Sequence, residues 1–134
     1  MMSDYTDMLQ LGMEGSSRRH DALANNIANV DTPGYKREDV EFRSALREKA
    51  GEARSKSEMA RTNPGHLRGR RTSDLQNNIN HFKETGTSLR HDENNVDIER
   101  EMAELAKNEI YFNTLSQQLD ARFNNLTTVI ERSG

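Results

Sequence analysis

The chain has 134 residues, the usual size of one domain, and a formal net charge of only −3. Leu, Ile, Val and Phe make up less than a fifth of it and the mean hydropathy is −1.01, so the composition excludes a large independent core and favours folding coupled to assembly. Cysteine is absent, which excludes disulfides, thiolate metal sites and cysteine nucleophiles.

The first predicted element is a helix from about Asp4 to Val30. Apolar residues recur at steps of three and four near its start and again at Leu23 and Ile27. No run approaches the roughly 20 apolar residues of a membrane span. The first ten residues carry two aspartates where a secretory signal has basic residues. The chain is therefore expected not to span a membrane, and any export is expected to proceed without a cleaved leader.

Small residues interrupt the apolar pattern of this helix. Gly12, Gly15, Ser16 and Ser17 stand where apolar side chains are expected. Each glycine costs a helix interior about 1 kcal/mol relative to alanine. Two interpretations stay open: the small residues let another backbone approach closely, or the helix is merely poor. In both cases the helix is predicted to be weak in isolation.

A turn is predicted directly after the helix. Thr32 precedes Pro33, and a residue before proline is disfavoured in the α region. Pro33 and Gly34 then fit the central pair of a type II turn, because glycine accepts the positive φ of the second position. The turn is expected to redirect the chain out of the helical layer.

The middle of the chain, residues 35–96, is predicted to be irregular, with short β-strands allowed near 76–82 and 87–90. The stretch 43–71 is strongly basic, which raises the hypothesis of nucleic-acid binding. That stretch lacks aromatic residues for base stacking, and the whole chain is acidic. A solvated or intersubunit face is the preferred interpretation, and no nucleic-acid partner is expected.

The strongest periodic signal lies in a predicted helix over residues 97–134. Asp97 fits the N-cap position, and Glu99 and Glu101 follow in the first turn, where the helix dipole favours anions. A period of 3.5 over a helix on the order of 50 Å long is typical of a coiled-coil seam. Steps of four and three give the row Ile98, Met102, Leu105, Glu109, Phe112, Ser116, Leu119, Phe123, Leu126 and Ile130.

No constellation of catalytic or metal-ligating residues is present in the sequence. The four histidines lack the spacing of a helical metal site, and the Ser and Thr residues lie in no nucleophile elbow. Glu101 and Glu104 are expected to be solvated charges on an exposed helix. We therefore expect no enzyme activity, no metal site and no cofactor.

Asparagines punctuate both predicted helices. Asn25, Asn26 and Asn29 lie at the end of the first, and Asn108 lies in the last with three more beyond it. Buried amides that face another helix fix its register at a cost in stability. A frayed, solvated helix end is the alternative, and the residues alone leave both interpretations open.

Three stretches resemble a known family. The N-terminal motif of bacterial flagellar axial proteins, the rod, hook and filament family, closely resembles residues 23–36, LANNIANVDTPGYK. The C-terminal motif of its proximal rod members, the FlgB type, is similar to residues 94–102, NNVDIEREM, with Leu105, Asn108 and Tyr111. A short middle motif of the same members is similar to residues 62–67.

The resemblance implies a structural subunit of the proximal rod of the flagellar basal body. Such a subunit is exported unfolded through the flagellar type III apparatus without leader cleavage, and it polymerises in the periplasm into a tube that transmits torque. The implied partners are copies of itself, FlgC-type rod proteins, the FliE adaptor and the flagellar export gate. A FlgC-type rod subunit is the nearest alternative. A coiled-coil adaptor or export chaperone is the alternative from a different class.

The chain is thus predicted to be mainly α, with a helix and turn in 1–34, an irregular middle in 35–96 and a helix in 97–134. The two terminal helices are expected to pack as a coiled-coil-like pair. Assembly roles are expected of residues in both motifs and in the apolar row. These residues are Leu23, Asn25, Asn26, Ile27, Asn29, Val30, Pro33, Gly34, Tyr35, Asn95, Val96, Asp97, Ile98, Met102, Leu105, Asn108, Tyr111, Phe112, Leu119, Phe123 and Leu126.

Overall fold

The computed structural model describes residues 2–59, 79–85 and 94–133. The motif in 62–67 and the expected strand near 87–90 lie outside the described residues. In chain order the elements are α1 (Met2–Ala28), β1 (Glu38–Glu41), α2 (Arg43–Met59), β2 (Asn80–Lys83) and α4 (Ile98–Ser133).

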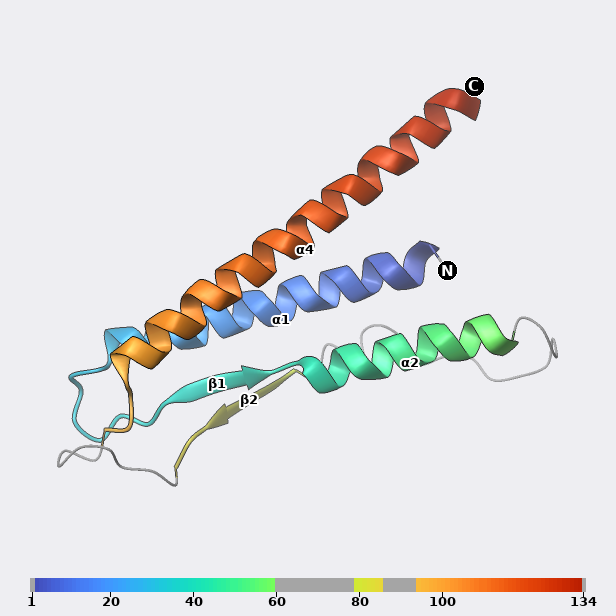
Figure 1. The fold of residues 1–134 in the computed structure, drawn as a ribbon. Coiled ribbons are helices and arrows are strands. Elements are labelled where there is room, and N and C mark those ends of the chain that lie inside the picture. The colour runs from blue at the N-terminus through green and yellow to red at the C-terminus, as the bar shows by residue number, and fades with distance from the viewer. Residues whose placement is uncertain (1, 60–78, 86–93, 134) are drawn as a thin grey trace.

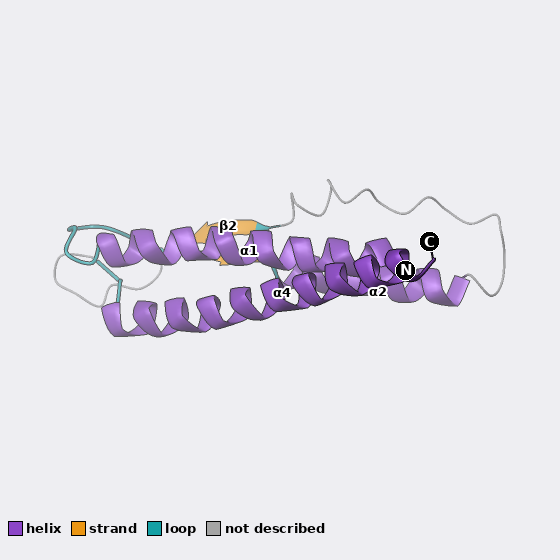
Figure 2. Cartoon of the chain, turned by 90° about the horizontal axis from the view of Figure 1, so that it is seen from above, coloured by secondary structure: helices purple, strands orange, loops and turns teal. Residues whose placement is uncertain are grey.

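The helix α1 lies between two layers. On one side α4 packs along it in the antiparallel direction, and on the other side lie β1, β2 and α2 (Figure 1). Figure 2 shows from above that the start of α1 and the end of α4 lie at the same end of the molecule. The predicted mainly α fold with paired terminal helices is confirmed.

A small apolar core fills the space between α1 and the layer of β1 and α2. Its buried cluster contains no residue of α4, although α4 is the longest helix described. The cluster consists of Leu11, Ala22, Val40, Phe42, Ala45 and Ile79, with Leu46 packed against it. The fully buried apolar cluster therefore joins α1 to β1 and α2 and not to α4.

The small residues of α1 are sites of close packing on two sides. A Cβ added at Gly15 would overlap the ring of Phe42, and one added at Gly12 would lie 3.0 Å from Cδ1 of Leu115. The glycines are therefore sites of close packing, but the expected approach of another backbone was wrong, because the nearest atoms belong to side chains.

The predicted turn after α1 is also confirmed. The amide of Tyr35 donates to the carbonyl oxygen of Thr32 at 3.3 Å, which closes a four-residue turn. Gly34 has a φ of +72°, as the second central residue of a type II turn requires. The chain then enters β1 alongside α1.

The middle region contains a helix that the sequence interpretation missed. The strands β1 and β2 pair antiparallel with Val40 opposite His81, and α2 begins two residues after β1 ends. α2 is rich in good helix formers, but alanine and the aliphatic stem of Lys49 make up much of its buried face. Its apolar period was therefore too weak to recognise within the basic stretch.

Candidate functional site

α1 and α4 meet along two rows of residues that repeat every seven positions. The ring of Tyr5 lies 5.9 Å from the guanidinium carbon of Arg122, and Gly12 faces Leu115. At the other end the Asn26 amide donates to Glu101 Oε2 at 2.8 Å. The rows are Tyr5, Gly12, Arg19 and Asn26 on α1, and Glu101, Asn108, Leu115 and Arg122 on α4. This seam is mostly polar or small.

Of the row expected on α4 from the sequence, only half of the positions are shielded from solvent. Its Leu105, Phe112, Leu119 and Leu126 are half-buried and flank the contact row. The other half is exposed, because the row that faces α1 lies one residue earlier, at 101, 108, 115 and 122. The exposed apolar row consists of Ile98, Met102, Phe123 and Ile130, of which Met102 and Ile130 are 59% and 70% exposed.

Asn26 joins three segments of the chain. Its Nδ2 donates to the Glu38 carbonyl at 2.7 Å in addition to the Glu101 carboxylate. Its Oδ1 accepts from the Glu38 amide at 2.9 Å and from the Tyr35 hydroxyl at 3.3 Å. The buried amide is therefore satisfied on both sides and holds α1, β1 and α4 together.

Asn94 binds the carboxyl end of α1. Its Nδ2 lies 3.0, 3.0 and 2.8 Å from the carbonyl oxygens of Asn29, Val30 and Thr32. Its Oδ1 accepts from the amide of Val96 at 2.8 Å. Carbonyls after the end of a helix have no helical partner, so this side chain supplies one from the segment that leads into α4.

Asn95 ties the same segment to the sheet. Its Oδ1 accepts from the amide of Arg37 at 2.7 Å, and its Nδ2 donates to the carbonyl of Glu84 at 2.9 Å. Asn94 thus binds the end of α1, and Asn95 binds the ends of β1 and β2. Together with Asn26, these two asparagines form a junction between α1, the sheet and α4.

A buried ion network lies beneath these amides. Arg37 is 2% exposed and donates through Nε to the Glu101 carboxylate, which is fully buried. Its other nitrogens donate to Glu84 at 2.9 Å and Asp39 at 3.2 Å. Burial alone would lower the pKa of Arg37, but the hydrogen bond and charge of Glu101, together with Asp39, raise it. The guanidinium therefore stays charged inside the junction.

Arg19 extends the network along α1. It donates to Asp39 at 3.1 Å and to Glu104 at 3.2 Å, and Lys107 binds the second oxygen of Glu104 at 2.8 Å. The hydrogen bond from Lys107 holds the pKa of Glu104 below its usual value against the opposite effect of burial. The expectation that Glu101 and Glu104 are solvated was wrong, because both carboxylates face cations from other segments.

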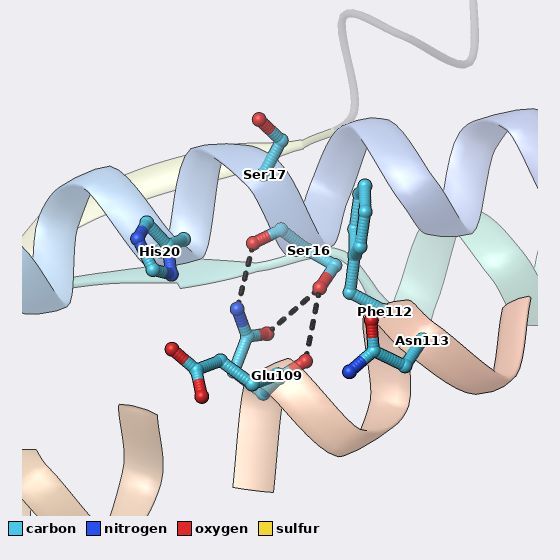
Figure 3. Close-up of a pocket in the computed structure, with 7 residues that line it drawn as sticks. Ser16, Ser17, His20, Glu109, Phe112 and Asn113 are labelled. Atoms are coloured by element: carbon cyan, nitrogen blue, oxygen red, sulfur yellow. Dashed lines mark hydrogen bonds between the residues drawn. The ribbon is translucent and has the colours of Figure 1, made fainter. Parts of the chain in front are cut away.

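A second amide contact lies farther along the helix pair. The Ser16 hydroxyl donates to Asn108 Oδ1 at 3.0 Å, and Asn108 Nδ2 donates to the Ser16 carbonyl at 2.8 Å (Figure 3). The exchange fixes how α1 and α4 are aligned along their axes. The structure therefore buries Asn26 and Asn108 as the register interpretation predicts. The other asparagines of the two predicted helices are half-buried or exposed: Asn25, Asn29, Asn113, Asn124 and Asn125.

The other predicted assembly residues lie in three environments. Asp97 caps α4, because its Oδ1 accepts from the amides of Glu99 at 3.0 Å and Arg100 at 3.3 Å. Tyr111 lies beside Phe42, with 6.1 Å between the ring centroids, and burial raises its pKa. By exposure the remaining residues divide into buried Leu23 and Val96, half-buried Ile27, Asn29, Val30 and Tyr35, and exposed Asn25, Pro33 and Gly34.

Sequence reasoning did not assign Arg37, Asn94 or Ser16 to the site. Arg37 and Ser16 follow no apolar period, and the partners of Arg37 and Asn94 lie far away in the sequence. Glu101 carried a usable signal, since it lies seven residues before Asn108 on the same helix face.

The junction binds segments of the chain to one another. Among the described residues, no group of three or more His, Asp or Glu side chains could hold a metal ion. In the same part of the chain, no helix combines the length and apolar character needed to cross a membrane.

Comparison with known proteins points to one family. The family model described as flagella basal body rod protein matches residues 10–36. The flagellar basal body rod protein FlgB of Bacillus subtilis (strain 168) is 33% identical over 97% of this chain and 95% of its own length. FlgB of Borrelia hermsii is 32% identical over 95% and 90%, and FlgB of Escherichia coli (strain K12) is 27% identical over 86% and 84%.

Proposed function

This chain belongs to the FlgB family of flagellar basal body rod proteins, and on that basis we propose that it builds the proximal rod by polymerising through its terminal helices. The chain is a structural subunit of the basal body rod. The proposal assigns no catalysis to it. The exposed apolar surface of α4 supports the use of the terminal helices, and the similarity to FlgB supports a place in the rod.

The exposed apolar row of α4 is the observation that carries the proposal. Met102, Phe123 and Ile130 stay exposed while the polar seam joins α4 to α1. Exposed apolar surfaces of this kind mark protein–protein contacts. Burying one large apolar side chain contributes roughly 1.5–3 kcal/mol. Because the row repeats in every copy, a polymer gains this contribution at each subunit.

The junction of amides and ions supplies stiffness. Asn26, Arg37 and Glu101 connect α1, β1 and α4 through satisfied hydrogen bonds. Removing one partner from a buried charge pair is strongly destabilising, typically by about 3–5 kcal/mol. A subunit braced in this way passes torque between neighbours without changing the angle between its helices.

We also propose how the chain is exported and which proteins it contacts. The unfolded chain passes through the flagellar type III apparatus without leader cleavage and assembles in the periplasm. The low content of large apolar residues supports this route, since few apolar contacts resist unfolding. Its neighbours are copies of itself, FlgC-type rod proteins, the FliE adaptor and the export gate.

Electron cryo-microscopy of purified basal bodies tests the proposal. In the bacterium that makes this chain, its gene is deleted and then restored, and basal bodies are isolated from both strains. We expect rods and motility only in the restored strain, with the chain traceable in density at the base of the rod. Complete rods in the deletion strain, or density that the chain does not fit, would contradict the proposal.

A further inference from the structure

A cleft of about 380 Å³ opens between α1 and α4 beside the Ser16–Asn108 contact. Figure 3 shows His20 of α1 and the Phe112 ring of α4 on either side of Ser16. Glu109 and Asn113, also from α4, complete the lower wall. The cleft thus combines one large apolar surface with hydrogen-bonding groups.

The rim of the cleft carries an available negative charge. Glu109 is exposed and forms no ion pair with another described residue. Phe112 is only half-buried, so part of its ring faces the cleft. An occupant that fits would place an apolar side chain against Phe112 and a cation near Glu109.

The end of α4 carries that combination. Since Tyr5 lies opposite Arg122 and the helices are antiparallel, residues after about 126 extend past the first residue of α1 (Figure 1). Val129 and Ile130 are exposed on this extension, and Arg132 lies in the last turn. Within the described residues Arg132 has no ion-pair partner.

We propose that the last two turns of α4 dock in the cleft of a second copy, an inference that rests on the proposed rod function. Val129 packs against Phe112 of the neighbour, and Arg132, which lies on the same helix face three residues later, lies near its Glu109. The complementary charge and apolar surface are both present in this one chain, which favours a second copy over a different partner.

The contact is heterologous, because extension and cleft are different parts of the chain. Phe112 and Val129 are separated by seventeen residues of α4, or roughly 26 Å along the axis. Each copy therefore has one extension and one cleft. Every copy binds two neighbours in this way, and the contact repeats along the polymer. Heterologous contacts build rings or open helical polymers, whereas isologous contacts stop at dimers.

Paired cysteines test this docking, and the absence of native cysteine makes each introduced pair unique. His20→Cys and Val129→Cys are combined in one chain, and basal bodies isolated from cells are oxidised. We expect a ladder of dimers, trimers and longer products from the double variant, and none from either single variant. Thr114→Cys with Val129→Cys is the control, because Thr114 is exposed on α4 but does not line the cleft.

The outcomes separate the docking from the rod function. A double variant that enters basal bodies without forming a ladder overturns the docking and leaves the rod function intact. Dimers from Val129→Cys alone, or products with a different protein, overturn it as well. Absence of even the unmodified chain from basal bodies counts against the rod function itself.

A charge exchange decides the case in which the cysteine variant fails to assemble. Glu109→Arg is expected to lower incorporation into basal bodies several-fold, because it places a cation opposite Arg132. Adding Arg132→Glu restores the opposite charges and should restore incorporation. Lack of rescue by the second change contradicts the docking.

Discussion

Asn94 and Asn95 bind backbone groups 65 and 58 residues earlier in the chain, and Asn26 binds the backbone of Glu38, 12 residues later. An amide that is paired at both ends contributes modestly to net stability, but leaving its partners unpaired costs much more. The junction therefore strongly favours one arrangement of the helices. The apolar period located the two helices in the sequence, but it could not reveal the Arg37–Glu101 pair, because ion pairs follow no period.

Asn26→Ala tests the junction at this scale. The change leaves the amide and carbonyl of Glu38 and part of the Glu101 carboxylate without a partner. We expect it to lower the free energy of unfolding by about 1–3 kcal/mol. Urea unfolding of the purified chain measures the change. Asn25→Ala is the matched control, because the neighbouring side chain is exposed; an equal loss in both variants would contradict the role assigned to Asn26.

Among the elements, the terminal helices were predictable and the middle was not. Asp97 caps α4 as predicted, and the Pro33–Gly34 turn follows α1 as predicted. α2 was missed because its buried face depends on alanine and a lysine stem, which resemble a solvated basic stretch. The register of α4 was half wrong for a related reason: an apolar pattern marks the surface that avoids water, whether or not that surface is buried within the same chain.

Two glycines in different helices give predictions of opposite sign. Gly51→Ala in α2 meets no atom within 4 Å and should stabilise the chain by up to about 1 kcal/mol through helix propensity. Gly15→Ala in α1 gains the same propensity but drives a methyl group into the Phe42 ring, and overpacking costs roughly 1–3 kcal/mol. We expect the urea midpoint to rise for Gly51→Ala and to fall for Gly15→Ala. A rise in both would show that α1 does not pack closely on Phe42.

At the scale of the whole molecule, the two layers beside α1 contact it through different kinds of residue. Polar and small residues join α1 to α4, and the buried apolar cluster joins α1 to β1 and α2. Much of the apolar surface of α4 is left exposed. A chain with few large apolar residues thus leaves part of them exposed, which supports the proposed contacts with other subunits. The composition indicated only that the core is small. Which contacts are polar and which are apolar follows from the fold.

Thiol labelling at Met102 tests the proposed contacts with other subunits most directly. Met102→Cys places one cysteine on the exposed apolar row of a chain that has no other. The rate of reaction with a maleimide is compared between the purified monomer and purified basal bodies. We expect fast labelling in the monomer and strong protection in the rod, because the row is exposed in one and covered by a neighbouring subunit in the other. Equally fast labelling in both would contradict the account, since the row would then face solvent in the assembled rod.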